Sequence, residues 1–241
     1  MSRDKTYLPA VLAVIVSAGI VSGARPAAAA LGLISRSEEI RLGQEAAQQM
    51  ESKYPTRRDR RVEGIGMDIV RANNLPDYPY RFRVIDRDEV NAVSLPGGPV
   101  YVYSGLLRMV GDDDDALAGV IAHELGHVKE RHAVDQMEKQ SLASLLIGNL
   151  TRGSLQGLAS IAANVGMLKF SRSDEYEADD DGALFMARAG YDPEGLLRFF
   201  QKLQRSEGRG SGISWLRTHP TSTQRIRRLQ GRVDALERRM R

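Results

Sequence analysis

The stretch VIAHELGHVKERH, residues 120–132, decides which fold and which chemistry the chain is expected to have. Apolar residues surround two histidines and a glutamate there, so a helix over these residues would lie inside the protein. His123 and His127 are four residues apart, which puts both side chains on one face of that helix with Cβ atoms about 5–6 Å apart. Two imidazoles at that separation can bind one zinc ion. Burying them without partners would be costly, so a metal site is favoured over a surface helix with scattered histidines.

Glu124 lies one position after His123, about 100° round the helix, so it cannot share an ion equally with the two histidines. It can instead face a water molecule beside the metal and accept its proton as the water attacks a carbonyl. His132 comes five residues after His127, about 140° round the same predicted helix. We therefore expect His132 to face away from the metal and to be packed or hydrogen-bonded behind the ligands.

A third ligand is expected from SRSDEYEADDDG, residues 171–182, because a catalytic zinc usually has three protein ligands and one open position. Glu175 and Asp179 are four residues apart and share a helical face. One can bind the metal while the other accepts the free ring N–H of a liganding histidine, and the spacing alone leaves the choice open. Glu177 faces elsewhere and is expected to be solvated. Two histidines, one acid and a nearby glutamate form the thermolysin type of peptidase site.

Capping and turn signals predict further helices along the chain. Ser35 and Glu38 form a capping-box pattern that opens a helix to about Met50, with Ile40 and Ala47 on its buried face. Four acidic residues, 112–115, are expected to cap the helix that carries the histidines, which should run to about residue 139. The other expected helices cover residues 58–72, a stretch from about residue 173, a stretch opened by Asp192-Pro193, the chain after THPTSTQRI, and a hairpin over residues 141–168 that is core packing or a mobile cover.

Between residues 81 and 103 the pattern changes to short strands around a Pro-Gly-Gly turn. Pro99 has no backbone N–H to donate, so the strand that it begins is expected at an edge of the sheet. The predicted fold class is therefore α+β, mainly helical with one small sheet.

Composition is that of an ordinary foldable protein of 241 residues, with 42% hydrophobic and 27% charged residues and a formal net charge of +3. Residues 205–241 carry ten arginines against three acidic residues. We interpret this excess as a solvated helical tail, not as a patch for nucleic acid. No nucleic-acid partner is predicted, and any contact with a membrane would be peripheral.

The N-terminus has the features of a secretory signal peptide. Arg3 and Lys5 precede an apolar run over residues 7–21, and small residues follow in SGARPAAAA, residues 22–30. We expect cleavage after Ala29, which leaves residues 30–241 as a single domain in the periplasm. The alternative is an uncleaved membrane anchor, for which the apolar run is short against the ~20 residues of a span. The chain has no cysteine, so disulfides and a lipid-modified N-terminal cysteine are excluded.

Five stretches together resemble the zinc metallopeptidase family that includes the CAAX prenyl endopeptidase, the heat-shock peptidase HtpX and periplasmic BepA-like proteases. They span about residues 35–230 and occur in the family's order: NAVSLPGGPVYVYSGLL, LAGVIAHELGHVKERH, SRSDEYEADDDG, AGYDP and THPTSTQRI. The resemblance implies a zincin-type fold in which an edge strand borders the active-site helix. We expect the chain to have neither the repeat domain of BepA-like members nor the membrane spans of the other two.

The resemblance also implies a site with one Zn²⁺ per chain. His123, His127 and Glu175 would bind the metal, with Asp179 as the acid behind them. Glu124 would be the general base, and His219 would steady the oxyanion or close onto the metal as a regulatory ligand. Substrate peptides would pair with the GGPVYVYS strand, and the substrate-binding residues would be Asn91, Ala92, Gly98 and Val100.

The expected function is that of a periplasmic zinc endopeptidase that hydrolyses envelope proteins in quality control. The alternative is an autoinhibited or chaperone-like protein that binds polypeptide clients and cleaves them rarely, with His219 or residues 141–168 blocking the metal.

Overall fold

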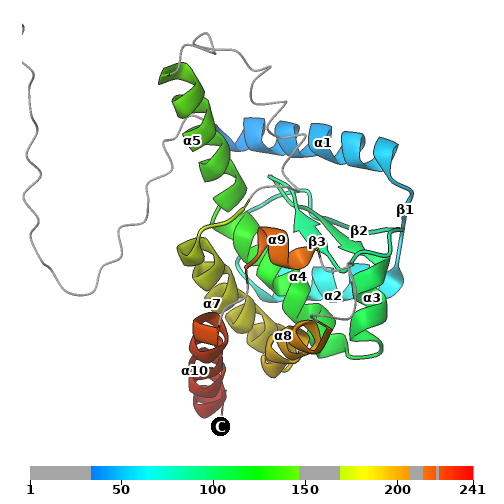
Figure 1. Ribbon diagram of the computed structural model, residues 1–241, viewed down its shortest axis with the longest axis vertical. Coiled ribbons are helices and arrows are strands. Elements are labelled where there is room, and N and C mark those ends of the chain that lie inside the picture. The colour runs from blue at the N-terminus through cyan, green and yellow to red at the C-terminus, as the bar shows by residue number, and fades with distance from the viewer. Residues whose placement is uncertain (1–33, 147–168, 207–213, 221–222, 241) are drawn as a thin grey trace, which may run out of the picture.

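A computed structural model describes residues 34–146, 169–206, 214–220 and 223–240. The predicted signal peptide, residues 1–29, lies outside the described residues, as do residues 147–168 of the predicted hairpin. Helices surround a small sheet (Figure 1). The described helices are α1 (Arg36–Lys53), α2 (Arg60–Ala72), α3 (Ser104–Val110), α4 (Asp114–Lys129), α5 (His132–Leu146), α7 (Arg172–Ala189), α8 (Glu194–Ser206), α9 (Trp215–Thr218) and α10 (Thr223–Met240).

The sheet has four strands in the order β1-β2-β4-β3. They are β1 (Thr56–Arg57), β2 (Arg81–Ile85), β3 (Ala92–Ser94) and β4 (Pro99–Tyr103), with β2 and β4 parallel and the outer pairs antiparallel. The prediction that the strand beginning at Pro99 is an edge strand is wrong, because β4 pairs with β2 on one side and β3 on the other. Proline is tolerated there because it is the first residue of the strand. The edge that contacts α4 is β3.

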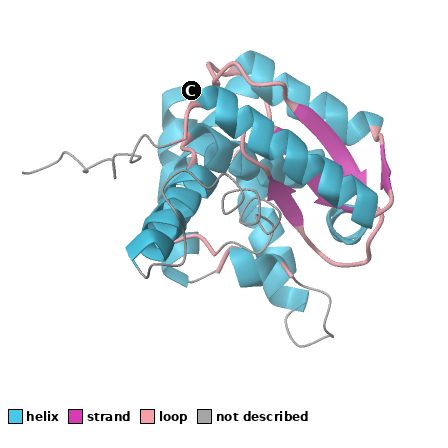
Figure 2. Ribbon diagram, turned by 90° about the horizontal axis from the view of Figure 1, so that it is seen from above, coloured by secondary structure: helices cyan, strands magenta, loops and turns pink. Residues whose placement is uncertain are grey.

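The two faces of the sheet pack against different helices, as expected when side chains alternate along a strand. Val84, Val100 and Val102 belong to the core that α2 and α4 build on one face. Ile85 and Tyr101 belong to a second core, built by α1 and the start of α5 on the other face. Every residue of β4 is therefore buried. In Figure 2 the strands lie toward one side of the molecule and the helices make up the rest.

Helix α4 starts where the sequence predicts, because the Asp113 side chain caps it by accepting a hydrogen bond from the Ala116 amide at 3.0 Å. The prediction of one helix to about residue 139 is wrong. The chain turns after Lys129, where Arg131 adopts a left-handed φ of 58°, and α5 begins at His132. A distant contact holds this corner, since Arg131 Nε donates to Glu39 Oε2 of α1 at 2.8 Å.

Helices α4 and α7 approach each other closely through small residues. A Cβ placed on Gly126 would lie 2.9 Å from the backbone Cα of Ala178, and one on Gly182 would lie 3.1 Å from the His123 amide nitrogen. A side chain at Gly126 would force the two helices apart, and one at Gly182 would be tightly crowded. The close approach brings the acidic residues of α7 to the histidines of α4.

Other local predictions are confirmed. The capping box of Ser35 and Glu38 opens α1, on which Ala47 is buried and Ile40 is half-buried. The Asp192 side chain accepts a hydrogen bond from the Glu194 amide where α8 begins. Within the part of the chain that the structure describes, no helix has the length and apolar character to cross a membrane.

Candidate metal centre

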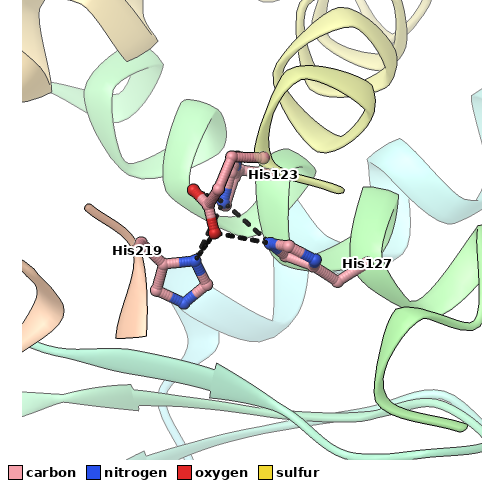
Figure 3. Close-up of side chains that lie close together, drawn as sticks. His123, His127 and His219 are labelled. Atoms are coloured by element: carbon pink, nitrogen blue, oxygen red, sulfur yellow. Dashed lines mark hydrogen bonds and ion pairs between the residues drawn. The ribbon is translucent and has the colours of Figure 1, made fainter. Parts of the chain in front are cut away.

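Four side chains from three separate segments converge in the interior. His123 and His127 come from α4, Glu175 comes from α7, and His219 follows α9. One potential ligand atom of each lies within 4.8 Å of the others, and all four residues are buried. Figure 3 shows the three imidazole rings directed toward a common centre. The structure thus brings together all four residues, including His219, which was expected at the site as an oxyanion stabiliser or a regulatory ligand.

The distances within the cluster suit a set of donors around one ion. His123 Nε2 lies 3.1 Å from His127 Nε2, and His219 Nδ1 lies 3.3 Å from His123 Nε2. Glu175 Oε1 is 2.9 Å from His219 Nδ1 and 3.6 Å from His127 Nε2. Two imidazole nitrogens, one carboxylate oxygen and a third imidazole form the kind of donor set that zinc binds.

His123 is supported from behind by a buried ion pair. Its Nδ1 lies 2.9 Å from Asp179 Oδ1, so its other nitrogen is left to face the cluster. Arg225 of α10 donates to both oxygens of Asp179, from Nε at 2.6 Å and from Nη2 at 2.8 Å. Burial acts to raise the pKa of Asp179, but the charge and hydrogen bonds of Arg225 outweigh it and hold this pKa at about 2.

His127 is supported by a second histidine. Its Nδ1 lies 2.9 Å from His132 Nδ1, and His132 Nε2 lies 3.1 Å from Glu177 Oε2. His132 therefore sits behind the cluster, as expected, even though the helix breaks before it. Glu177, which was predicted to be solvated, is only partly so, since its side chain is 29% exposed and pairs with His132. Burial lowers the pKa of both His127 and His132.

Glu124 lies beside the cluster with its two oxygens in different surroundings. Its Oε2 accepts a hydrogen bond from Ser94 Oγ of β3 at 2.7 Å. Its Oε1 has no hydrogen-bond partner among the described residues and lies 3.4 Å from His219 Nε2. A buried carboxylate oxygen that makes no hydrogen bond is unusual, and this one faces His219 of the cluster. Ser94 was not predicted to belong to the site, although it lies in the stretch NAVSLPGGPVYVYSGLL that carries part of the family resemblance.

Aromatic rings hold two of the imidazoles in place. Trp215 of α9 stacks on His219 with 4.1 Å between ring centroids, and Phe170 stacks on His127 at 3.9 Å. The Trp215 amide also donates to the Val90 carbonyl at 3.0 Å, just before β3. These contacts were not predicted from the sequence, because neither aromatic residue lies in a helix that was expected near the site.

The residues predicted to bind substrate fall into two groups. Ala92 begins β3, the edge strand that contacts α4, and Asn91 precedes it with its side chain bonded to the Ala92 amide at 3.0 Å. Val100 lies on the interior strand β4 and is fully buried, with neighbours paired on both sides. Gly98 lies in the turn before that strand, close to Tyr78. An edge for pairing with a peptide is therefore offered by β3 and not by the strand that begins at Pro99.

Comparisons with known proteins agree with this geometry. The model of a family described as Peptidase family M48 matches residues 56–233. The beta-barrel assembly-enhancing protease of Escherichia coli (strain K12) is 30% identical, over 84% of this chain and 45% of that protein. Two further relatives from the same strain are metalloprotease YcaL, 32% identical over 76% of this chain and 71% of the relative, and metalloprotease LoiP, 30% identical over 91% and 89%. The chain spans about half the length of the first of these relatives.

Proposed function

The chain belongs to peptidase family M48, and on that premise we propose that it is a zinc-dependent endopeptidase acting on polypeptides of the bacterial envelope. The observation that carries the proposal is the convergence of His123, His127 and Glu175 from two helices, with Glu124 beside them. These residues suit a metal because both histidines use Nδ1 in outer contacts, which leaves each Nε2 free for an ion.

We assign the metal ligands to His123, His127 and Glu175, with Asp179 as the acid that orients His123. A zinc ion bound there would polarise a carbonyl and would lower the pKa of a water molecule to about 7. The proton transfers are carried out by side chains of the protein. Glu124 has the role of general base, because Ser94 holds its Oε2 and leaves Oε1 to accept a proton from the attacking water. The same carboxyl group then gives the proton to the leaving amine.

His219 has two roles in this proposal. Its Nδ1 is near enough to Glu175 and His123 to be a fourth donor, which closes the site. With a substrate bound, the same imidazole would instead stabilise the negative charge on the carbonyl oxygen. A complete donor set with a general base beside it favours an enzyme over a protein that only binds clients.

Substrate peptides are proposed to add to the edge of β3, the strand that ends the described sheet. In the antiparallel pairing of β3 with β4, Val93 lies opposite Tyr101. Ala92 and Ser94 lie on either side of Val93, so their backbone N–H and C=O groups face away from β4. A peptide paired at this edge would run past Glu124 and the metal ligands. Residues 1–29 are proposed to export the chain to the periplasm, where unassembled envelope proteins would be its substrates.

Replacing Glu124 with glutamine tests the proposal. Casein cleavage by the purified protein should fall by about 10²–10⁴-fold, because the amide cannot accept the proton. Zinc content should stay at one per chain in Glu124→Gln. Glu45→Gln is the matched control, since Glu45 lies on the surface of α1 in an exposed pair with Arg41. Cleavage by Glu124→Gln at the parental rate, or cleavage by the parent that a chelator does not reduce, would overturn the assignment.

A further inference from the structure

Arg225 is the most deeply buried arginine next to the proposed metal site. It lies in the first turns of α10 and its residue is only 1% exposed. A guanidinium cannot lose its charge in a protein, so burying one is costly unless acceptors surround it. The arginine-rich end of the chain was expected to be solvated, and this residue departs from that expectation.

The contacts of Arg225 connect both acidic residues of the site. Its Nε and Nη2 grip the two oxygens of Asp179 as a fork, at 2.6 and 2.8 Å. Its Nη1 forms an ion pair with Glu175 Oε2 and donates to the Pro220 carbonyl, next to His219, at 3.3 Å. The guanidinium carbon lies 4.8 Å from the centroid of the Phe200 ring, which covers one face of the group. The Arg225 side chain therefore contacts the proposed ligand Glu175, the carboxylate of Asp179 behind His123, and the loop that contains His219 and Pro220.

We propose that Arg225 is a positioning residue that fixes the carboxylates of Glu175 and Asp179 in the orientation that metal binding needs. The proposal rests on the zinc site proposed above. Planar, bidentate pairing with a carboxylate is specific to arginine, because its donors form a rigid fork. With Asp179 clamped on one side, its Oδ1 is directed at His123 Nδ1. With Oε2 of Glu175 held by Arg225, its Oε1 is left facing His127 and His219.

Charge balance supports the same assignment. The buried carboxylates of Glu124, Glu175 and Asp179 carry three negative charges when ionised, and Arg225 supplies one positive charge among them. One divalent cation would neutralise the remainder. Arg225 thus limits repulsion between the carboxylates before the metal binds. The net negative charge that remains is the amount that a single Zn²⁺ would neutralise.

A different role for Arg225 would change zinc affinity in the opposite direction. If the residue acted only as a positive charge near the site, its removal would strengthen zinc binding, because cation–cation repulsion would be lost. If it acts by holding the carboxylates, its removal weakens zinc binding, as the loss of an outer-sphere partner typically does by about 10–100-fold. The sign of the change separates the two roles.

The test compares Arg225→Gln, Arg225→Lys and the control Arg228→Gln in the full chain. Arg228 lies one turn further along α10 and pairs with Asp180 of α7, but this pair is partly exposed and includes none of the proposed ligands. Zinc affinity of the stripped protein is measured by competition with a chromophoric chelator. The visible spectrum of Co²⁺ bound in place of zinc reports the geometry of the ligands.

Both Arg225 variants should bind zinc about 10–100-fold more weakly and alter the cobalt spectrum, and Arg228→Gln should do neither. Lysine keeps the positive charge but cannot form the bidentate hydrogen bonds to a carboxylate. If Arg225→Gln does not fold, Arg225→Lys alone tests the proposal. Unchanged or tighter zinc binding by a folded Arg225 variant would overturn the inference. Failure of the parent protein to bind one zinc would instead refute the proposed function, so the two failures are distinguishable.

Discussion

The two histidines of α4 face the same centre but are supported in different ways. Behind His123 stands a buried ion pair, in which Asp179 and Arg225 are each at most 3% exposed at the side chain. Behind His127 stands a neutral imidazole, His132, whose own partner Glu177 is 29% exposed. The first support is charged, dry and fixed by a fork of hydrogen bonds. The second support, which we call the relay, runs from His127 through His132 to Glu177, close to solvent.

Both supports assign the same tautomer to their histidine, which we infer from the hydrogen-bond network. A carboxylate only accepts, so the Nδ1–H of His123 donates to Asp179 and Nε2 keeps its lone pair for the metal. In the relay, the Nδ1–H of His127 donates to His132, whose Nε2–H donates to Glu177. A histidine ligand can therefore be oriented with or without a charged partner, but only the charged support raises the basicity of its ligand strongly.

The largest effect is expected when the charged support is broken. Asp179→Asn keeps an oxygen for His123 but removes the negative charge, and it leaves the buried Arg225 with a weaker partner. Zinc affinity should fall by about 10–100-fold, and the free energy of unfolding of the metal-free protein should fall by up to about 3–5 kcal/mol. Chelator competition and urea unfolding measure the two effects.

Asp180→Asn is the matched control for this substitution, because Asp180 is the next residue of α7 and pairs with the partly exposed Arg228. Its effect on stability should stay within about 1 kcal/mol. If Asp180→Asn cost as much as Asp179→Asn, the burial of the charged support would not be what matters.

The charged support was only half visible in the sequence. Glu175 and Asp179 were found because spacing of four residues puts both on one helical face, and this periodicity is local. Arg225 was missed because it lies among many arginines. A signal was present, since Arg225 is in register with Leu229, Val233 and Leu236, which are buried on the same side of α10. A charged residue on the face of a helix that otherwise buries apolar side chains indicates that its partner is buried too.

Local sequence patterns did not predict how the chain builds the relay. His132 was expected behind the ligands on a continuous helix, but the chain turns at Arg131, which is not a glycine. The contact that holds the turn, from Arg131 to Glu39, joins residues 92 positions apart. The edge strand was misplaced for a similar reason, because proline at the start of a strand fits an interior strand as well as an edge. Long-range pairing decided both cases.

A smaller effect is expected when the relay is broken. His132→Phe removes the acceptor of the His127 Nδ1–H but keeps a ring of similar size in the packing. Zinc affinity should fall by about 10-fold, near the lower end of the range for outer partners, because no charge is lost. Chelator competition measures the change.

Glu177→Gln tests whether the relay depends on its last member. The amide oxygen can still accept from His132 Nε2, and the site is partly exposed, so zinc affinity should change by no more than about twofold. A loss in Glu177→Gln as large as that in Asp179→Asn would show that the relay carries charge to His127, and the contrast between the two supports would disappear.

The smallest difference is expected in the response to acid of the metal-free protein. Burial lowers the pKa of His132 below 6.5 despite the acidic neighbours Asp174 and Glu130, and it lowers that of His127 further. The unfolded chain therefore takes up protons that the folded chain does not. Stability falls below about pH 6.5, by up to about 1.4 kcal/mol per pH unit for each such histidine. The contribution of Asp179, whose pKa is about 2, is present above pH 3.8 and is lost only between pH 3.8 and 2.

Acidification should thus weaken the relay before the charged support. Urea unfolding of the chelated protein from pH 7.5 to 4.5 should show a shallower fall in stability for His132→Phe than for the parent, because one of the two histidines no longer titrates. Equal slopes would mean that His132 binds its proton as readily when folded as when unfolded. The relay would then behave like a solvated pair, and burial would not explain how His127 is held.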